Sequence, residues 1–485
     1  MINQSAGVAS LGGAVTVIGV LTLTNGNLNL SGFDLTLGPT ATISVAALSA
    51  TRMIIATGGN QVIKTFSGVG SFVFPIGDNT GAPEYSPITV NITAGSGFPS
   101  NIGVSVVDAK HPNNSSATNF LTRYWEITQP GITGCVATVT GTYTAADITG
   151  TEGSINAAQL SGTFNQTSNP WVKYAALGAN TLTATGASLT LGQTNAFTGI
   201  TGANPVATIV GGGVSVCIGS SVNLNTNVTG DASFTYAWTS VPIAGGLSAT
   251  NIANPVATPT ATTTYTVTVR DGNGIVDTDV STITVNPLPA APTIVSSGST
   301  VCDGVNPDVT LTSSAAPNGG TNYVWYKGGV PTGDVGNSLV INDPAGSGLY
   351  TVAVIDGITF CLSPQSVGEI VTINALPLHY SRIVAPATTT VCSGSTVTVN
   401  VAGSQAGINY ELFDGVTSLS SQRVAGTGGA INLVTSALTA NTTITVRATN
   451  PVTSWTTLLS GTSVVTVNSD SSNTYHWSSR SGSSV

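Results

Sequence analysis

Apolar and polar residues alternate along most of this chain. Residues 263–269 read Thr-Thr-Tyr-Thr-Val-Thr-Val, and residues 282–286 and 396–400 repeat the same two-residue period. That period puts one set of side chains on a core face and the other in solvent, and β-branched Thr and Val suit the pleated strands that result. Clusters of Gly, Asn, Asp and Pro separate the runs, as hairpins require. No run of ten or more residues shows a clear helical period, although residues 145–160 are less regular, so the pattern predicts an all-β protein.

A repeat organises the C-terminal half of the chain. The motif Val-Cys-x-Gly occurs three times, and its cysteines are 85 and 90 positions apart (302 − 217 and 392 − 302). Similar strands close the three units, at 283–286, 371–374 and 465–468. A unit of this length with a central Trp and a late Tyr fits a seven-stranded sandwich. We therefore expect Trp238 and Trp325 in two of the cores, whereas the third unit has Leu412 at this place.

Composition narrows the class of protein. The 485 residues are enough for three to five domains, and only 6% of them are charged. The net charge is −9 and the 11 basic residues form no cluster, which argues against a nucleic-acid partner. The chain has no run of about 18 consecutive apolar residues, so the sequence predicts no membrane-spanning helix. A surface covered by Thr, Ser, Asn and Gly is common in extracellular β-proteins.

The repeat resembles a known type of module. Its Val-Cys-x-Gly opening, its Tyr-x-Trp strand and its strand at 263–269 are similar to the PKD-like and Ig-like modules of large cell-surface or secreted proteins of Bacteroidota. The resemblance covers roughly residues 204–470. It implies type IX secretion and an adhesin-like role, and it gives little information about the ligand. The region that contains 74–78, 85–90 and 123–127 is similar to one that often precedes such modules.

The expected architecture is an N-terminal β-rich region, solenoid-like or sandwich, followed by tandem Ig-like or PKD-like β-sandwiches. The domains are a short solenoid-like β-repeat at 1–48, a β-sandwich of unknown role at 49–202, modules at 203–288, 289–377 and 378–470, and a Ser-rich tail at 471–485. Neither a secretory signal at 1–10 nor the family's sorting domain is recognisable. We expect the chain to be a piece of a longer or processed protein that is extracellular or at the cell surface.

Five cysteines leave at least one without a partner in the chain. The resemblance implies a disulfide between Cys302 and Cys361. Cys135, Cys217 and Cys392 are interpreted as small buried apolar residues, with an intermolecular bridge as the alternative. No Cys-x-x-Cys motif exists and the three histidines are isolated, so a zinc site is not expected.

Calcium is the small ligand that the sequence favours most. The segment 271–279 offers the oxygens of Asp271, Asn273, Asp277 and Asp279 in a short loop. It lacks the EF-hand pattern, because Ile275 occupies a ligand position and no Glu closes the loop. The alternative interpretation is an Asp-Gly/Asn-Gly hairpin turn without metal.

The sequence offers candidates for two other kinds of site. Trp171 and Trp455 lie outside the repeat frame and are candidates for a glycan-binding platform, with burial in a core as the alternative. The only candidate carboxylates for catalysis are Glu84, Asp108, Glu126 and Glu152, and their spacing along the chain does not bring them together. We expect no buried cluster of titratable residues and no enzyme.

The sequence thus predicts a non-catalytic stalk or spacer with an adhesion function at a bacterial cell surface. Its partners would be extracellular glycans or surface proteins. Two alternatives stay open: a carbohydrate-binding accessory region of a larger secreted enzyme, and a self-assembling filament subunit, which an unpaired edge strand or N-terminal segment would favour.

Overall fold

A computed structural model describes residues 2–45, 47–231, 233–243, 245–303, 308–377, 384–420 and 422–469. The expected tail at 471–485 and the start of the third module at 378–383 lie outside these ranges. The chain divides into two compact units, Met1–Asn286 and Pro287–Val485. The described residues form strands and four short 3-10 turns, η1 to η4 (Ala145–Asp147, Glu152–Ser154, Pro317–Gly319, Pro344–Gly346). None of their helical segments is long and apolar enough to cross a membrane. The predicted all-β fold is confirmed.

The N-terminal sandwich is built from three main sheets. A six-stranded sheet contains β1 (Ile2–Ser10), β3 (Val20–Asn29), β5 (Thr42–Val45), β6 (Ile54–Ile55), β9 (Ile76–Asp78) and β10 (Glu84–Tyr85). An eight-stranded sheet runs through β2 (Val15–Val17), β4 (Leu35–Leu37), β7 (Val62–Phe66), β12 (Ser100–Val107), β14 (Tyr124–Thr128), β20 (Thr194–Thr201), β17 (Ile155–Ser161) and β18 (Val172–Ala176). A four-stranded sheet contains β8 (Gly70–Phe74), β11 (Ile88–Ser96), β15 (Thr133–Thr142) and β19 (Thr181–Ser188), and β13 (Phe120–Leu121) pairs with β16 (Ile148–Thr149).

The first strands stack as parallel solenoid coils. β1, β3, β6 and β9 pair in parallel on one side, and β2, β4 and β7 pair in parallel on the other. Leucines that alternate along β3 and β4 point inward and share one core with the sandwich, for example Leu23, Leu35 and Leu37. The segment 1–48 is therefore continuous with 49–202, where the sequence suggested two domains, because the same sheets run through both.

Module 1 has a sheet of β22 (Ser215–Cys217), β28 (Val276–Asn286), β27 (Thr263–Arg270) and β25 (Thr235–Val241). The facing strands pair as β21 (Val206–Val210) with β24 (Asn225–Thr229) and β23 (Val222–Asn223) with β26 (Val256–Ala257). Trp238 and Tyr265 are buried in its own core.

Modules 2 and 3 belong to the second unit. Module 2 contains β29 (Ile294–Ser296), β31 (Val309–Ser313) and β34 (Ser338–Ile341) facing β30 (Thr300–Cys302), β36 (Glu369–Asn374), β35 (Gly348–Val354), β32 (Tyr323–Lys327) and β33 (Val330–Pro331). Module 3 contains β37 (Val384–Ala385), β39 (Thr398–Val401) and β43 (Ile431–Val434) facing β38 (Thr388–Cys392), β45 (Thr456–Asn468), β44 (Thr442–Thr449), β40 (Asn409–Asp414), β41 (Thr417–Ser418) and β42 (Val424–Ala425). Each module has a separate core.

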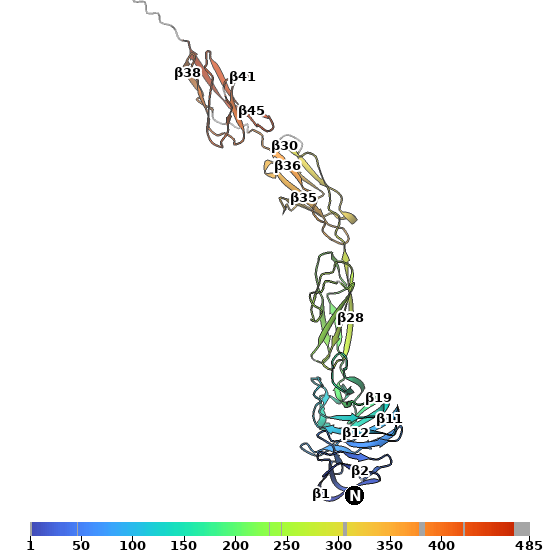
Figure 1. The fold of residues 1–485 in the computed structure, drawn as a ribbon. Coiled ribbons are helices and arrows are strands. Elements are labelled where there is room, and N and C mark those ends of the chain that lie inside the picture. The colour runs from blue at the N-terminus through green and yellow to red at the C-terminus, as the bar shows by residue number, and fades with distance from the viewer. Residues whose placement is uncertain are drawn as a thin grey trace, which may run out of the picture. The chain divides into compact units, whose positions relative to one another are not determined.

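The three modules share one strand register. Trp238 lies opposite Val267, Trp325 opposite Val352, and Leu412 opposite Val446. All three side chains are buried, with at most 3% of each exposed. Leucine thus fills the tryptophan position in module 3, and buried Tyr410 completes that core. Figure 1 shows the succession of elements within each unit.

Candidate functional site

Four carboxylates surround Arg123 inside the N-terminal sandwich. The guanidinium is fully buried and pairs with Asp78 and Glu84, with Asp147 at 2.9 Å (Nε to Oδ2) and with Asp108 at 3.3 Å (Nη2 to Oδ1). Asp78 and Glu84 lie opposite each other on β9 and β10. Carboxylate oxygens of Asp78, Glu84 and Asp108 lie within 4.8 Å of one another. This buried titratable cluster contradicts the sequence-based expectation that none would exist.

The cluster is organised as an ion network. Burial raises the pKa of both Glu84 and Asp108, and Arg123 opposes that shift. All three guanidinium nitrogens of Arg123 are engaged with carboxylates, so the network ties β9, β10 and η1 to the residue that precedes β14. The sequence contained one indication that Arg123 points inward. It lies two positions before Trp125, and residues two apart along a strand point to the same face.

The other two acids considered for catalysis lie elsewhere. Glu126 is on the opposite face of β14 from Trp125, and burial raises its pKa although a bond from Ser105 opposes this. Glu152 accepts hydrogen bonds from the Tyr143 hydroxyl and the Asn180 amide, both at 2.7 Å. These two carboxylates do not join the Arg123 network, which leaves Glu84 and Asp108 as the pair that the fold brings together.

A second polar site joins the sandwich to module 1 within the first unit. It is formed by the turn 271–274 between β27 and β28. The amide of Trp171 donates to the carbonyl of Asn273 at 3.1 Å, and Gln166 Nε2 donates to the carbonyl of Asp271 at 2.5 Å. The Asn273 side chain accepts from the amide of Ser115 at 2.9 Å and donates to Ser116 Oγ at 3.0 Å. We call this set of contacts the hairpin junction.

Two glycines allow the close approach at the hairpin junction. A Cβ on Gly274 would lie 2.4 Å from Pro170 Cβ, and its φ is +89°, a left-handed conformation that favours glycine. A Cβ on Gly272 would lie 2.4 Å from Ser115 Oγ. The Asp-Gly-Asn-Gly sequence therefore serves both the turn and the packing against the sandwich.

The predicted calcium ligands do not converge. The Oδ1 atom of Asp271 accepts from the amides of Asn273 and Ile275 at 3.0 and 2.8 Å, which is a turn-stabilising role. Asp277 and Asp279 lie on β28, where they accept from the amides of Ala207 and Ile209 on β21 at 2.8 and 2.7 Å. Strand geometry thus directs these two carboxylates away from the turn. Among the carboxylate oxygens of the predicted calcium ligands, Asp271 Oδ2 is still suited to bind a cation, because it is buried without a hydrogen-bond partner.

The two candidate glycan-binding tryptophans differ in exposure. Trp171 is 1% exposed and its Nε1 donates to the carbonyl of Asn113 at 2.9 Å, so its ring cannot serve as a stacking surface. Trp455 lies in the turn before β45 and is 48% exposed. The two belong to different units of the chain. Only Trp455 is accessible to a sugar ring.

The disulfide implied between Cys302 and Cys361 is not formed, because Cys302 is a free thiol. Cys302 lies opposite Asn374 at one end of module 2. Tyr350 lies opposite Glu369, and β35 continues from there to Val354, away from that end. Nine residue steps at about 3.3 Å separate the two ends by about 30 Å, well beyond disulfide reach.

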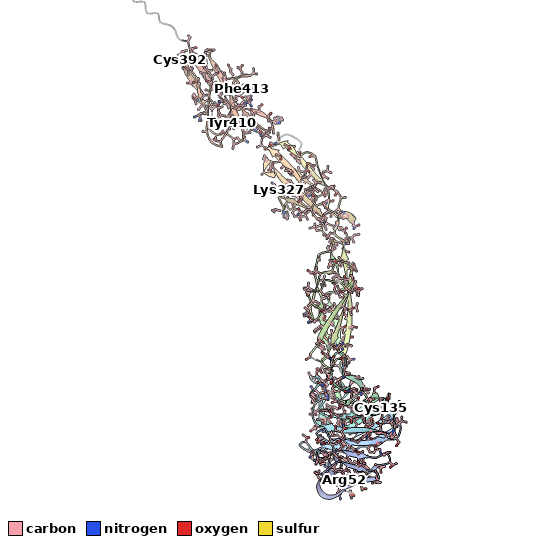
Figure 2. All side chains as sticks on the ribbon, viewed as in Figure 1. Arg52, Cys135, Lys327, Cys392, Tyr410 and Phe413 are labelled. Atoms are coloured by element: carbon pink, nitrogen blue, oxygen red, sulfur yellow. The ribbon has the colours of Figure 1, made fainter. Side chains whose placement is uncertain are left out.

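The thiols of Cys135 and Cys392, which Figure 2 labels, have different environments. Cys135 is buried in the core of the sandwich, and this burial raises its pKa to about 11, as expected for a small apolar residue. Cys392 is an exposed free thiol at the end of β38, so the expectation that it is buried is wrong.

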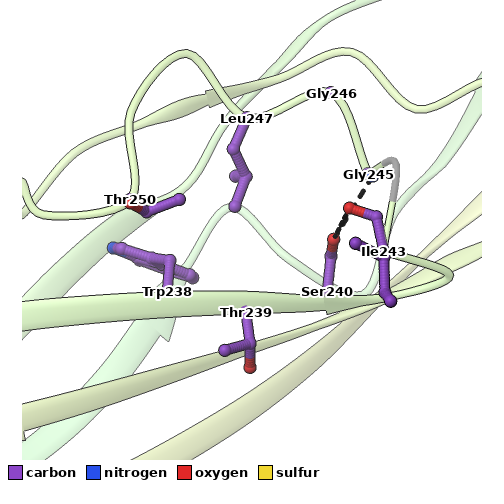
Figure 3. Close-up of a pocket in the computed structure, with 8 residues that line it drawn as sticks. All are labelled: Trp238, Thr239, Ser240, Ile243, Gly245, Gly246, Leu247 and Thr250. Atoms are coloured by element: carbon purple, nitrogen blue, oxygen red, sulfur yellow. Dashed lines mark hydrogen bonds between the residues drawn. The ribbon is translucent and has the colours of Figure 1, made fainter.

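Module 1 has a pocket of about 450 Å³ beside the edge strand β25 (Figure 3). Its lining residues are Trp238, Thr239, Ser240, Ile243, Gly245, Gly246, Leu247 and Thr250. Ser240 Oγ bonds the carbonyl of Ile243 at 3.1 Å and the amide of Gly245 at 3.2 Å, which fixes the loop over the strand. Titratable groups are absent from this lining, so it offers shape and apolar contact and no acid–base chemistry.

Comparisons with known proteins give distant likenesses. No family model and no curated protein matches the chain. The insect immune protein hemolin, described with implications for homophilic adhesion, is 14% identical, with 69% of this chain and 95% of that chain covered and a TM-score of 0.26. Murine CEACAM1b is 16% identical over 35% of this chain and all of its own, with a TM-score of 0.22. The first four Ig domains of a Dscam1 isoform are 12% identical over 54% of this chain and 78% of that chain, with a TM-score of 0.18. With these identities and TM-scores, the likenesses place the chain in none of these families.

Proposed function

We propose that the chain is a non-catalytic stalk or adhesion protein at a bacterial cell surface, in which tandem β-sandwich modules act as a spacer or present repeated surfaces to a partner. The observation that carries this proposal is the way in which successive modules are joined. In the first unit the turn after β27 is buried against the sandwich through Asn273. In the second unit the turn after β44 supplies Asn450, whose Nδ2 donates to the carbonyl of Ala375 at 2.9 Å.

The two turns are equivalent in their modules. The amide of Asp271 donates to the carbonyl of Ile275, and the amide of Asn450 donates to the carbonyl of Trp455, both at 2.9 Å. Each turn lies between the last two long strands of its module. The turn of module 1 bonds the preceding sandwich, and the turn of module 3 bonds Ala375, which directly follows β36 of module 2. Relative motion of neighbouring domains is the default across a linker, and these hydrogen bonds oppose it, which supports a spacer that holds its modules in sequence.

The cell-surface location, the Bacteroidota origin and type IX export are parts of the proposal that rest on the resemblance of the repeat. The low charged fraction of 6% and the Thr- and Ser-rich strand faces support an extracellular environment. The proposed partners are extracellular glycans or surface proteins.

Single-molecule pulling tests the spacer role. The chain is tethered at its two ends and stretched at constant speed. Each module is expected to unfold in its own step, releasing about 300 Å for the 85–90 residues between equivalent cysteines, at up to about 3.6 Å per residue. Gradual extension without such steps would contradict the proposal, because a spacer must resist force module by module.

Carbohydrate binding is a second candidate function because one accessible ring supports it, the 48% exposed Trp455. A glycan array on the intact chain, with Trp455→Ala beside it, tests this alternative. Saturable binding that the substitution removes would support it. Equal signals from both proteins, or none from either, would reject carbohydrate binding through Trp455 and leave the spacer role as the proposed function.

A further inference from the structure

Module 1 lacks a strand that modules 2 and 3 both have. β25 is the terminal strand of its sheet, whereas the equivalent strand β32 pairs with β33, and the equivalent strand β40 pairs with β41 and β42. β25 lies in the interior of the sequence, spans seven residues and pairs with β27 in one continuous register. Its other side is therefore a regular strand edge at a place where the sister modules carry a further strand.

The sequence explains why module 1 lacks this strand. In modules 2 and 3 the added strand follows a hairpin turn that begins with a glycine, Gly328 or Gly415, at φ values of +55° and +58°. Module 1 has Val241 at this position, followed by Pro242. Valine is strongly disfavoured in the left-handed region, and proline has no amide to donate to a neighbouring strand. The chain therefore leaves β25 here and forms the loop that lines the pocket (Figure 3).

The backbone of β25 offers hydrogen-bonding groups on this open side. The amide of Trp238 donates to the carbonyl of Thr250 at 2.8 Å, so the backbone of Trp238 faces away from β27. The backbone of Ser240 faces the same way, because alternate residues of a strand share a direction. Among the described residues, none donates to the Trp238 carbonyl and none accepts from the Ser240 amide. Both groups are therefore available to an added strand.

Modules 2 and 3 show what occupies the equivalent position. The carbonyl of Trp325 accepts from the amide of Thr332, and the carbonyl of Leu412 accepts from the amide of Leu419, both at 2.8 Å. The donors directly follow β33 and β41, which run antiparallel to their neighbours. The Leu419 side chain is partly buried against the core of module 3. The occupant is thus an extended segment that contributes a backbone amide and, in module 3, an aliphatic side chain.

The pocket of module 1 is suited to a segment of this kind. Its volume of about 450 Å³ is lined by uncharged residues, among them Trp238 and Leu247. The rim is aliphatic, since Val241 is 73% exposed and Ile243 is 95% exposed. Residues 235–269 contain no Asp, Glu, Lys or Arg. An aliphatic side chain would be removed from water here, whereas a charged one would be desolvated without gaining a partner.

We propose that the pocket and the open edge of β25 bind an extended, uncharged peptide segment of a partner protein, which adds to the sheet antiparallel to β25. An amide of the segment donates to the Trp238 carbonyl, the Ser240 amide donates to a carbonyl of the segment, and an aliphatic side chain enters the pocket. In strand addition the backbone hydrogen bonds provide affinity and the pocket provides specificity. The site rests on the adhesion role proposed above and gives that role one defined surface.

Peptide titration of the intact chain tests the site. The probe is a fluorescently labelled peptide with the sequence of residues 415–420, Gly-Val-Thr-Ser-Leu-Ser, because this segment fills the equivalent place in module 3. Saturable binding is expected below about 1 mM peptide, the weak end of specific association. The same peptide N-methylated at its leucine lacks the donor to the Trp238 carbonyl and should bind about tenfold more weakly.

Two variants locate the binding. Ile243→Lys places a charge at the rim of the pocket and should weaken binding about tenfold, and it should fold as the parent does because the side chain is 95% exposed. Val280→Lys, at a 56% exposed valine on β28 of the same sheet, is the matched control and should bind as the parent does. Hydrogen exchange of the Ser240 amide should slow on addition of the peptide to the parent and to the control.

The outcomes separate this site from the spacer role. Absence of saturable binding up to about 1 mM overturns the proposal, as does equal binding of the two peptides or of the two variants. Self-association of the intact chain that free peptide reverses would assign the pocket to a second copy and overturn the separate partner. Stepwise unfolding in the pulling experiment without peptide binding would reject this site alone, and peptide binding without stepwise unfolding would reject the spacer role alone.

Discussion

His111 is a buried titratable group beside the hairpin junction. Its ring packs edge-on against Tyr124 and Trp171, with centroids 4.8 and 5.0 Å away. Its Nδ1 accepts from the amide of Asn113 at 3.2 Å, which requires the neutral ring. Burial lowers the pKa of His111 to about 4.

This shift predicts an acid-dependent loss of stability in the first unit. His111 binds a proton near pH 6.5 in the unfolded chain and near pH 4 in the folded chain. The contribution of the neutral ring to the free energy of unfolding is therefore complete above pH 6.5 and declines as pH falls toward 4. The loss should amount to about 3 kcal/mol over that window. Urea unfolding at pH 7, 5.5 and 4 measures it. His111→Phe keeps the ring and should flatten this part of the profile; an unchanged pH dependence would contradict the assignment to His111.

Asp271 provides a test of the calcium hypothesis. Burial raises the pKa of Asp271, although its hydrogen bond from the Ile275 amide opposes the shift, so the ionised carboxylate costs stability above its ordinary pKa. Asp271→Asn retains the Oδ1 acceptor and should stabilise the first unit by about 1 kcal/mol at pH 7. We also expect a chelator to leave the melting temperature unchanged. Calcium-dependent melting of the parent that disappears in Asp271→Asn would instead establish a metal site.

Side chains that alternate along long strands were predictable from the sequence. Trp238 and Trp325 are buried as the repeat indicated. Arg123 was missed because a buried arginine is rare and its four acidic partners, 15 to 45 positions away along the chain, follow no strand or helix period. The predicted pairing of Cys361 with Cys302 was wrong for a related reason. Which end of the module a loop lies at depends on the direction of the strands that it joins, and the spacing of the cysteines along the sequence does not give that direction.

At the scale of elements, the hairpin junction shows a turn with two roles. The Asp-Gly-Asn-Gly turn connects β27 to β28, and it also fills a site formed by residues around Ser115 and Trp171. Sequence reasoning identified the turn, whereas the partner segments are more than 100 positions away along the chain. The solenoid-like strands were predicted, but their continuity with the sandwich depends on parallel pairing such as β4 with β7, which alternation alone does not specify.

Asn273→Ala tests the coupling at the hairpin junction. The substitution removes an acceptor for the Ser115 amide and a donor to Ser116 Oγ, both in a buried setting, so a loss of about 1–3 kcal/mol is expected. Asp279→Ala is the control within module 1, because its bond goes to β21 and not to the sandwich. Hydrogen exchange should quicken at residues 113–117 in Asn273→Ala and not in the control. Equal exchange in both variants would show that the junction does not couple the two domains.

The whole molecule is a series of separate cores. The buried clusters of modules 1, 2 and 3 contain different residues, and the two units divide at Asn286. Stability in such a chain is close to a sum of module terms and terms between neighbours. Damage to one core should therefore remain local, which would let a spacer lose one module without losing the others.

Trp325→Ala tests this independence. The fully buried ring donates from Nε1 to the carbonyl of Gly336 at 2.9 Å, and its loss should cost module 2 about 3–5 kcal/mol. Val330→Ala, a side chain 66% exposed in the same module, is the matched control and should change little. Hydrogen exchange at rising urea should show module 2 opening early in Trp325→Ala while residues 2–286 keep their parent profile. If the first unit loses protection together with module 2, the cores are energetically one body, and resistance to force would have to come from the whole chain unfolding at once.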